Sequence, residues 1–256
     1  HGLTFIGPSA EVIDSMGNKS HARKTMMEAG VPVVPGTKEP VYDAQTGEKL
    51  AEEIGYPVMI KASSGGGGKG MRVAKNPEEF EFQFNMAQRE SANAFGDDTM
   101  YIERFVENPR HVEIQVIADT FGNVAALGER DCSVQRNHQK LIEESPSPAI
   151  SEETRQKMNR DAVLAAKAVG YTNAGTVEFI LAQDGTYYFM EMNTRIQVEH
   201  GVTEMVTGTD LIIEQIRIAM GEPLSFRQED VVLRGHAIEC RINAEIPEKN
   251  FMPSPG

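Results

Sequence analysis

Ala174-Gly-Thr-Val-Glu-Phe-Ile-Leu-Ala-Gln183, followed by Asp184-Gly185 and then Thr186-Tyr-Tyr-Phe-Met-Glu-Met-Asn193, is the stretch that decides the fold. Asp-Gly between two runs of strand-forming residues is a strong signal for a β-hairpin with a two-residue turn. With that turn, Gln183 lies opposite Thr186, and Glu178 lies opposite Glu191. The pattern therefore predicts an antiparallel hairpin that carries two neighbouring carboxylates on one face.

These opposed carboxylates predict a metal site. Like charges directly opposite each other repel, so a cation is expected between Glu178 and Glu191. Asn193 lies two residues further along and shares their face. Such oxygen ligands suit Mg²⁺ or Mn²⁺, with one or two ions. A solvated face with accidental acids is the alternative. The other face is expected to be core and comprises Val177, Phe179, Leu181, Tyr188, Met190 and Met192.

Composition narrows the class of protein. The chain has 256 residues, of which 40% are hydrophobic and 25% charged, and a net charge of −13, which argues against a nucleic-acid binder. Two cysteines, Cys132 and Cys240, form no disulfide framework and favour a cytoplasmic location. No apolar run has transmembrane length, so no membrane is expected. We expect both ends, at His1 and at Pro253-Ser-Pro-Gly256, to be cut from a longer chain.

The order of predicted elements favours an α+β fold, because strands come in hairpins rather than in regular alternation with helices. The Pro-rich stretch 31–36 is the first candidate domain boundary. Strands are predicted over 3–7, 56–62, 71–74, 99–106, 111–119, 124–129 and the two arms of the hairpin. Helices are predicted over 18–29, 48–54, 76–93, 151–170 and 209–220.

A glycine-rich loop, Ser63-Ser-Gly-Gly-Gly-Gly-Lys-Gly70, is the second informative feature. It satisfies G-x-G-x-x-G, but a strand-like segment follows where a dinucleotide fold requires a helix. Lys69 precedes a glycine rather than Ser or Thr, so the loop is not a P-loop either. Glycines between two strands predict a flap whose backbone N–H groups contact phosphates, with Lys61 adding a charge. A surface loop without function is the alternative.

Polar residues recur at intervals of two after the hairpin, at Glu191, Asn193, Arg195, Gln197 and Glu199. If the segment stays extended, these side chains line one face and could hold a metal-bound polyphosphate and a small anion. A solvated edge strand has the same periodicity. Two further polar clusters, 135–140 and 234–245, are equally compatible with surface strands.

Five motifs together resemble the biotin carboxylase family, and the similarity extends over essentially the whole chain. They are Lys61-Ala-Ser-Ser-Gly-Gly-Gly-Gly-Lys-Gly-Met-Arg72, Glu107-Asn-Pro-Arg-His-Val-Glu-Ile-Gln115, Glu129-Arg-Asp-Cys-Ser-Val-Gln-Arg136, Glu191-Met-Asn-Thr-Arg-Ile-Gln-Val-Glu-His200 and Gly235-His-Ala-Ile-Glu-Cys-Arg-Ile-Asn-Ala-Glu245.

The resemblance implies an ATP-grasp fold, with a remnant of the amino-terminal domain at 1–32, a lid domain at 33–105 and a truncated catalytic domain at 106–256. It also implies a ligase that carboxylates biotin with ATP and bicarbonate through carboxyphosphate. The implied partners are a biotin carboxyl carrier protein or domain, a carboxyltransferase and, at full length, a second copy of the chain. The parent enzyme we favour is a cytoplasmic acetyl-CoA carboxylase of fatty acid biosynthesis, with pyruvate and propionyl-CoA carboxylases as alternatives.

Residue roles also follow from the resemblance, position by position. ATP would contact Lys19, Lys61, Gly67, Gly68, Glu103, Arg104, Phe105, Val106, His111, Gln135 and His138. Mg²⁺ or Mn²⁺ would be held by Glu178, Glu191 and Asn193, in agreement with the hairpin argument. Bicarbonate would be held by Lys140, Arg195, Gln197 and the backbone of Val198. Glu199 would be the general base, and Arg241 would face the ureido oxygen of biotin and stabilise the enolate.

The chain departs from the family pattern at a few points. Gly201 replaces the usual proline, and Asn137 replaces the usual arginine. Most of the amino-terminal domain and the portion after Gly256 are missing, so we expect weak nucleotide binding and poor turnover. Another ATP-grasp ligase, such as a peptide-bond or carbamoyl-phosphate enzyme, would share the lid and the hairpin but not Arg241 with 197–200. A nucleotide-binding module or an inert fragment is the non-enzyme alternative.

Overall fold

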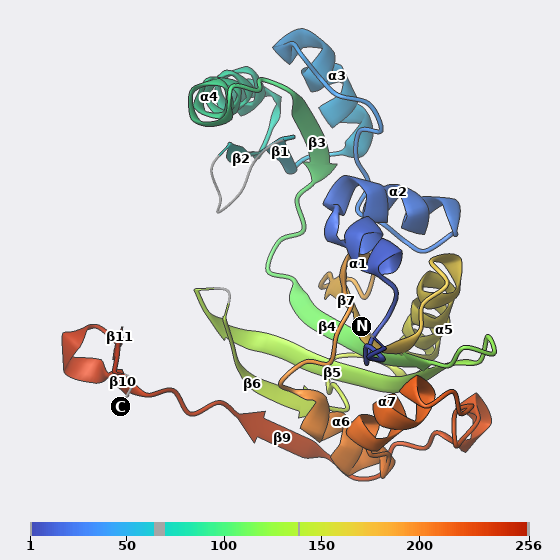
Figure 1. The fold of residues 1–256 in the computed structure, drawn as a ribbon. Helices are drawn as coiled ribbons and strands as arrows, with labels where there is room; N and C mark the ends of the chain where they lie inside the picture. Colours follow the sequence, from blue (N-terminus) through green and yellow to red (C-terminus); the bar gives the residue numbers. More distant parts are fainter. Residues whose placement is uncertain (1, 64–69, 138, 255–256) are drawn as a thin grey trace. The chain divides into compact units, whose positions relative to one another are not determined.

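The computed structural model describes residues 2–63, 70–137 and 139–254, and for Lys19 and Ser20 it describes the backbone only. The chain divides into two compact units, one formed by 1–33 with 109–256 and the other by 34–108 (Figure 1). The division into a remnant (1–32), a lid (33–105) and a catalytic domain (106–256) stays a prediction.

The smaller unit is a three-stranded antiparallel sheet with two helices packed against it. The strand order is β2-β1-β3. Its elements are α3 (Ala44–Ile54), β1 (Val58–Ala62), β2 (Met71–Ala74), α4 (Pro77–Phe95) and β3 (Met100–Arg104). Asn76 begins α4 as predicted, because its side-chain oxygen accepts the backbone N–H of Glu79 at 3.0 Å and proline follows at the first helical position.

The larger unit is built on a six-stranded antiparallel sheet in the order β8-β7-β4-β5-β6-β9. Its helices are α1 (Ala10–Gly17), α2 (Lys19–Glu28), α5 (Glu152–Ala168), α6 (His200–Thr207) and α7 (Leu211–Ala219). Its strands are β4 (Arg110–Ala118), β5 (Val124–Arg136), β6 (Gln139–Ser145), β7 (Asn173–Leu181), β8 (Tyr187–Asn193) and β9 (Ala237–Cys240). A short hairpin of β10 (Glu245–Ile246) and β11 (Met252–Pro253) follows.

The two faces of this sheet have different neighbours. Even-numbered residues of β4, such as Val112 and Ile114, pack in one core with α1, α2 and α5. Odd-numbered residues face the other way, and Ile117 packs in a separate core with Leu211 of α7. Because strand side chains alternate between faces, His111 and Glu113 share the face of Ile117, which is the face that carries the candidate site.

The predicted hairpin forms, but its turn differs from the prediction. Glu178 pairs with Glu191 as predicted, whereas Phe179 pairs with Phe189 and Leu181 with Tyr187. The turn contains three residues rather than two, because Ala182 N–H donates to the carbonyl of Thr186 at 2.8 Å. Gly185, with φ of 84°, supplies the left-handed residue that such three-residue loops use. A bulge at Glu178/Phe179 then restores the expected register at the acidic pair.

The bulge also corrects the predicted core face. Phe189 is 5% exposed and packs in the core, whereas Met190 is 40% exposed and lines the candidate pocket. Met190 is the extra residue of the bulge. From Met190 back to the turn, each side chain of β8 therefore lies on the face opposite to the one that simple alternation predicts. Tyr188 is likewise outside the core that the alternation predicts for it.

Other differences are local. The sequence predicts a strand over 3–7, but these described residues adopt no strand. The elements without a counterpart among the predicted helices and strands are α1, β6, α6, β9, β10 and β11. No helix in the described part of the chain has the length and apolar character needed to cross a bilayer. Cys132 is buried, Cys240 is exposed, and neither forms a disulfide.

The smaller unit has an aromatic core that can be tested. Phe84 is fully buried, and its ring centroid lies 5.8 Å from that of Phe80, whereas Phe82 on the same helix is 65% exposed. We expect Phe84→Ala to lower the free energy of unfolding by about 3–5 kcal/mol because it leaves a cavity. Urea denaturation measures this change. The control Phe82→Ala should change stability by less than about 0.5 kcal/mol, and equal effects of the two substitutions would contradict the packing.

Candidate active site

A row of charged side chains crosses the middle of the six-stranded sheet. Glu191 of β8 pairs with Glu178 of β7, which pairs with Glu113 of β4, which pairs with Arg130 of β5. Side chains at paired positions lie on the same face and within contact distance. Three neighbouring strands therefore bring three carboxylates together, one more than the hairpin alone predicts.

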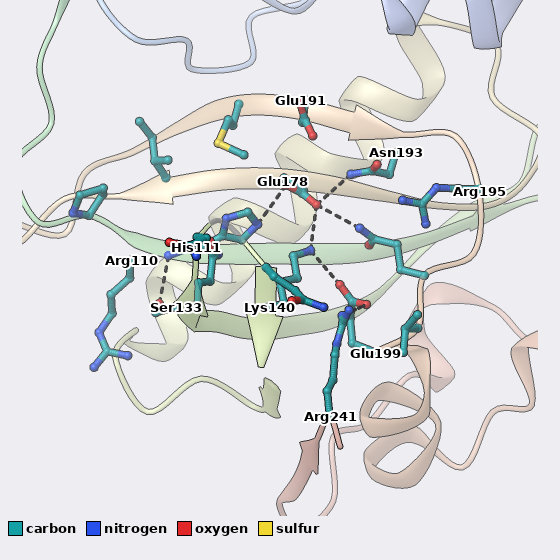
Figure 2. A pocket seen from close by; sticks show the side chains of 18 residues that line it. Arg110, His111, Ser133, Lys140, Glu178, Glu191, Asn193, Arg195, Glu199 and Arg241 are labelled. Carbon is teal, nitrogen blue, oxygen red and sulfur yellow. Dashed lines mark hydrogen bonds and ion pairs between the residues drawn. The ribbon is translucent and has the colours of Figure 1, made fainter. Parts of the chain in front are cut away.

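Lys140 offsets much of this negative charge. Its ammonium group donates to Glu178 Oε1 at 2.9 Å and to Glu199 Oε1 at 2.7 Å (Figure 2). It also donates to Glu113 Oε2. All three N–H donors of the lysine thus meet carboxylates. Burial by itself would lower the pKa of Lys140, but Glu113 and Glu178 raise it above its ordinary value. Lys140 is consequently a fixed positive charge.

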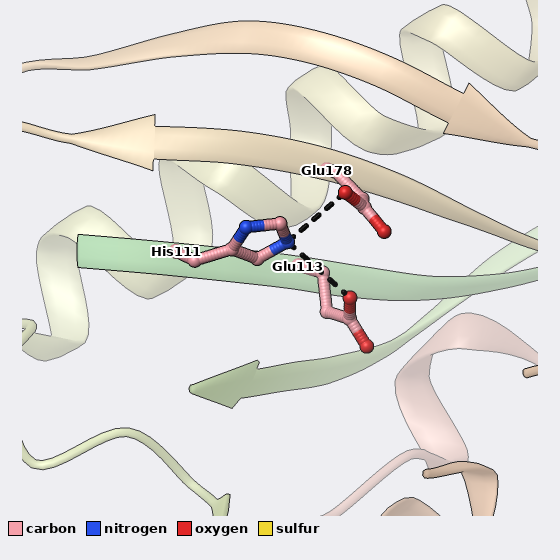
Figure 3. A group of neighbouring side chains, drawn as sticks. All are labelled: His111, Glu113 and Glu178. Atoms are coloured by element: carbon pink, nitrogen blue, oxygen red, sulfur yellow. Dashed lines mark ion pairs between the residues drawn. The ribbon is translucent and has the colours of Figure 1, made fainter. Parts of the chain in front are cut away.

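His111 is a second cation next to the same acids (Figure 3). Its Nε2 lies 3.0 Å from Glu178 Oε2 and 3.7 Å from Glu113 Oε2. Burial would lower the pKa of His111, but the two glutamates raise it to about 9. The imidazole is therefore protonated at neutral pH. In this state it is an ion-pair partner of the two glutamates, and it could ligate a metal only after losing its proton.

The acids are ionised for the same reason. Burial would raise the pKa of Glu113, but Arg130, His111 and Lys140 hold it well below its usual range. Burial would raise the pKa of Glu178 as well, but His111 and Lys140 together lower it below its ordinary value. Cys132, which lies close to Glu113 and Glu199, behaves differently, because burial raises the pKa of its thiol. It is a protonated thiol and not an activated nucleophile.

Arg241 and Glu199 form the second half of the site. Arg241 Nη2 donates to Glu199 Oε2 at 2.8 Å, and Arg241 Nε lies 2.6 Å from Glu143 Oε1 without hydrogen-bond geometry. Glu143, on β6, is fully buried and is absent from the site residues that the sequence predicts. Its burial raises its pKa, against the effect of Arg241. Arg241 is thus held between two buried carboxylates and lines the same cavity as Glu199.

The polar stripe predicted from the sequence lines one pocket. A cavity of about 750 Å³ is lined by all five of its members, Glu191, Asn193, Arg195, Gln197 and Glu199, and by Val198. His111, Gln135, Lys140, Glu178 and Arg241 line the same cavity. The strand β8 ends at Asn193, so the later members reach the pocket from a loop and from the start of α6 rather than from an extended strand.

The donor set fits a divalent metal ion. Glu178 and Glu191 contribute carboxylate oxygens from adjacent strands, and Asn193 lines the same cavity. Asn193 Nδ2 donates to Glu178 Oε1 at 2.8 Å, so its oxygen faces away from that carboxylate. Rotation of the amide by half a turn would present the oxygen instead. The metal role of these three residues stays a prediction.

The predicted nucleotide residues are divided between the two units. Lys61 of β1 forms an ion pair with Glu103 of β3, and both lie in the smaller unit. The backbone N–H groups of Arg104 and Phe105 donate to Pro35 and Pro57, and Val106 is half-buried. Gly67, Gly68 and His138, and the side chain of Lys19, lie outside the described residues. The assignment of all these residues to ATP therefore stays a prediction.

The two departures from the family pattern lie in positions that accept them. Gly201 is in the first turn of α6, where the nearest atom to an added Cβ would be Glu239 Oε2 at 3.7 Å. Asn137 has φ of 51°, a left-handed conformation that asparagine tolerates better than arginine. It occupies the turn between β5 and β6, next to the strand that carries Lys140.

Sequence reasoning missed Glu113, Arg130 and Glu143. A signal was present for Glu113, because it lies two residues after His111 in a predicted strand and so shares its face. The predicted helices and strands do not place Arg130 or Glu143 on any face of the sheet. The predicted strand ends at 129, and β6 is not predicted at all.

The fold and this cavity define an ATP-grasp module of the biotin carboxylase type. A family described as the carbamoyl-phosphate synthase L chain, ATP binding domain, matches residues 18–227, and the chain belongs to it. It is 62% identical over 255 residues to a protein named biotin carboxylase 1 of Bacillus subtilis, with 99% of this chain and 57% of that protein covered.

Two further relatives indicate the range of parent enzymes. A pyruvate carboxylase subunit from Methanothermobacter thermautotrophicus is 55% identical, and the match covers 100% of this chain and 52% of that protein. The biotin carboxylase domain dimer of the Hydrogenobacter thermophilus 2-oxoglutarate carboxylase, solved with MgADP, ADP and bicarbonate, is 51% identical with a TM-score of 0.82. The match covers 98% of this chain and 56% of that chain. The chain thus spans about half the length of these relatives.

The protonation state of His111 gives a testable pH dependence in metal-free buffer. The folded pKa of about 9 exceeds the ordinary value of 6.5, so the stabilisation by His111 is complete below about pH 6.5 and is lost as pH rises through 9. We expect wild type to exceed His111→Gln in unfolding free energy by up to about 3 kcal/mol below pH 6.5, and by almost nothing above pH 9.

Urea denaturation of both proteins between about pH 6 and 9.5 measures this difference. His21→Gln, on the exposed surface of α2, is the control and should show a small difference throughout. A difference between wild type and His111→Gln that does not vary with pH would contradict the proposed ion pairs.

Proposed function

We propose that this chain carries the catalytic core of a biotin carboxylase, which uses ATP and bicarbonate to carboxylate biotin attached to a carrier protein. The observation that carries the proposal is a single cavity that carries acids and cations together. Its lining includes Glu178, Glu191, Glu199, Lys140, Arg195 and Arg241. The relatives with biotin carboxylase names and the complex of one of them with MgADP and bicarbonate support it.

In this proposal Glu178, Glu191 and Asn193 hold Mg²⁺ or Mn²⁺. When bound, such an ion offsets the charge of the nucleotide phosphates during phosphoryl transfer. Lys140 and Arg195 bind the oxygens of bicarbonate, together with Gln197 and the backbone of Val198. The ammonium of Lys140 lines the cavity, and in this proposal a bicarbonate oxygen replaces one of its present carboxylate contacts.

Glu199 is the proposed general base that removes the proton of bicarbonate. Its two oxygens accept from Lys140 and Arg241, so the carboxylate has a fixed orientation. Arg241 is proposed to neutralise the ureido oxygen of biotin when the adjacent nitrogen loses its proton. A fixed cation at a developing oxyanion is worth roughly 3–4 kcal/mol, by analogy with oxyanion-hole donors.

The proposal also names the partners of the chain. They are a carboxyltransferase and a biotin carboxyl carrier protein, and a homodimer is proposed for the full-length protein. Acetyl-CoA carboxylase remains our preferred parent, although relatives include parts of pyruvate and 2-oxoglutarate carboxylases. Because the chain spans about half of its relatives, a nucleotide-binding fragment without turnover is the second candidate.

Thermal unfolding with ligands tests the proposed metal and nucleotide site. Mg-ATP at about one hundred times its Kd should stabilise the folded chain by about 2.7 kcal/mol and raise Tm by several degrees. Glu191→Gln should abolish the part of this shift that depends on magnesium. Glu153→Gln, an exposed acid on α5, should leave it unchanged.

Bicarbonate separates the two candidate functions in the same experiment. A further rise of Tm when bicarbonate is added to Mg-ATP is expected for a biotin carboxylase core. A shift with Mg-ATP that bicarbonate does not alter would favour a plain nucleotide-binding module, and no shift at all would contradict both.

Replacing Arg241 tests the proposed biotin contact. We expect Arg241→Ala to reduce incorporation of labelled bicarbonate into biotin by about 10²–10³-fold while leaving the affinity for Mg-ATP unchanged. Because this change leaves the buried Glu143 without its arginine, the double variant Arg241→Ala/Glu143→Gln removes the unpaired charge and controls for misfolding. Loss of ATP binding by both variants would contradict the assignment of roles.

A further inference from the structure

Arg130 lies beneath the pocket and contacts no solvent. Its side chain is fully buried on β5, and a guanidinium has five N–H donors. All five have acceptors, which are Glu113 Oε1 at 2.6 Å, Gln115 Oε1 at 2.6 Å, Thr203 Oγ1 at 3.0 Å, Thr176 Oγ1 at 3.2 Å and Gln197 Oε1 at 3.2 Å. The orientation of this group is therefore fully determined by β4, β7, α6 and the loop before α6.

One of these acceptors belongs to the cavity. Gln197 lines the pocket and is 6% exposed. Its Oε1 accepts from Arg130, while its Nε2 donates to Glu178 Oε1 at 3.0 Å. Arginine can only donate and an ionised carboxylate can only accept, so the amide has one orientation that satisfies both neighbours.

The two neighbours do not contribute equally to this orientation. The contact with Glu178 is lost whenever that carboxylate turns toward another cation, and Glu178 is one of the proposed metal ligands. The contact with Arg130 lies on the side of the amide that faces the protein interior, where Arg130 is fully buried. It therefore does not depend on what occupies the cavity. Reversal of the amide would direct its NH₂ group at the guanidinium, which leaves two donors facing each other in a buried place.

We propose that Arg130 is a positioning residue, which fixes the side chain of Gln197 with its NH₂ group toward the cavity and so makes this wall a hydrogen-bond donor for a small oxyanion. The inference rests on the proposed function, in which that oxyanion is bicarbonate. Together with Lys140 and Arg195, the oriented amide gives the anion end of the cavity donors from two segments, the strand β6 and the loop between β8 and α6.

A purely structural role for Arg130 makes different predictions. If Arg130 served only as the counter-ion of Glu113, its replacement would lower stability and would affect all ligands alike. As a positioning residue it acts through Gln197, so bicarbonate should be affected far more than nucleotide. The two substitutions should then also be coupled in a double-mutant cycle.

The orientation itself can be measured in the wild-type chain without any substitution. In a protein with ¹⁵N-labelled glutamine, we expect nuclear Overhauser contacts from the Gln197 NH₂ protons to side-chain protons of Glu178 and Asn193. Contacts from these NH₂ protons to the guanidinium protons of Arg130 would overturn the inference, whichever ligand the cavity takes.

The functional consequence is measured by titrating ¹³C-bicarbonate in the presence of Mg-ADP. Arg130→Lys keeps the positive charge next to Glu113 but removes the planar guanidinium group whose Nη2 reaches Gln197. We expect it to weaken the affinity for bicarbonate about tenfold and to change the affinity for Mg-ADP less than twofold. Thr203→Val removes a different acceptor of the same guanidinium and should leave both affinities within about twofold.

The cycle uses Gln197→Met in both backgrounds. We expect Gln197→Met to weaken bicarbonate binding about tenfold in the wild type and less than threefold in Arg130→Lys, since the amide is no longer held there. Equal losses in both backgrounds, or equal losses of bicarbonate and Mg-ADP in Arg130→Lys, would overturn the inference. Failure of the wild type to bind bicarbonate would overturn the proposed function instead, and the nuclear Overhauser contacts would still decide the orientation.

Discussion

The row Glu191, Glu178, Glu113 and Arg130 across four strands is the constraint on which the rest of the site depends. Adjacent acids on one sheet face repel, and burial makes each charge more costly. Glu113 and Glu178 are satisfied by neighbouring cations, chiefly Lys140 of β6 and His111 of β4. The strand order β8-β7-β4-β5-β6 is therefore what brings these charges together on one face of the sheet.

The same balance of charge would allow Glu178 to exchange its contacts with Lys140 and His111 for a contact with a ligand. Lys140 and His111 occupy positions around Glu178 that a divalent ion and nucleotide phosphates would compete for. Because neighbouring cations lower the pKa of Glu113 and of Glu178, the proposed metal ligand Glu178 could accept an ion without first losing a proton. The second pair of buried acids, Glu143 and Glu199, holds Arg241 in the same manner. Ion pairs therefore fix the orientation of side chains both around Glu178 and around Arg241.

Part of this site was accessible from strand periodicity. The hairpin predicts that Glu178 opposes Glu191, and the structure confirms that pair. The predicted turn was one residue too short, and the bulge at Met190 was not predicted. The bulge shifts the register by one residue in the opposite sense, so the predicted pair is correct although the predicted turn is wrong. The fold class, α+β with an ATP-grasp arrangement, was also predicted correctly, since hairpins and long motifs are local features of the chain.

What the sequence determined by itself was therefore local: the helix caps, the acidic hairpin and the polar stripe from 191 to 199. Tertiary structure alone decided that Arg130 and Glu143 belong to the site, because they join it through pairing between strands that are distant in sequence. For Glu113 the strand period indicates the face, and the packed sheet decided that it meets Glu178. Tertiary structure also decided the orientation of the Gln197 amide, which depends on a buried guanidinium 67 residues away. Periodicity specifies a face, whereas only the packed sheet specifies which charges meet on it.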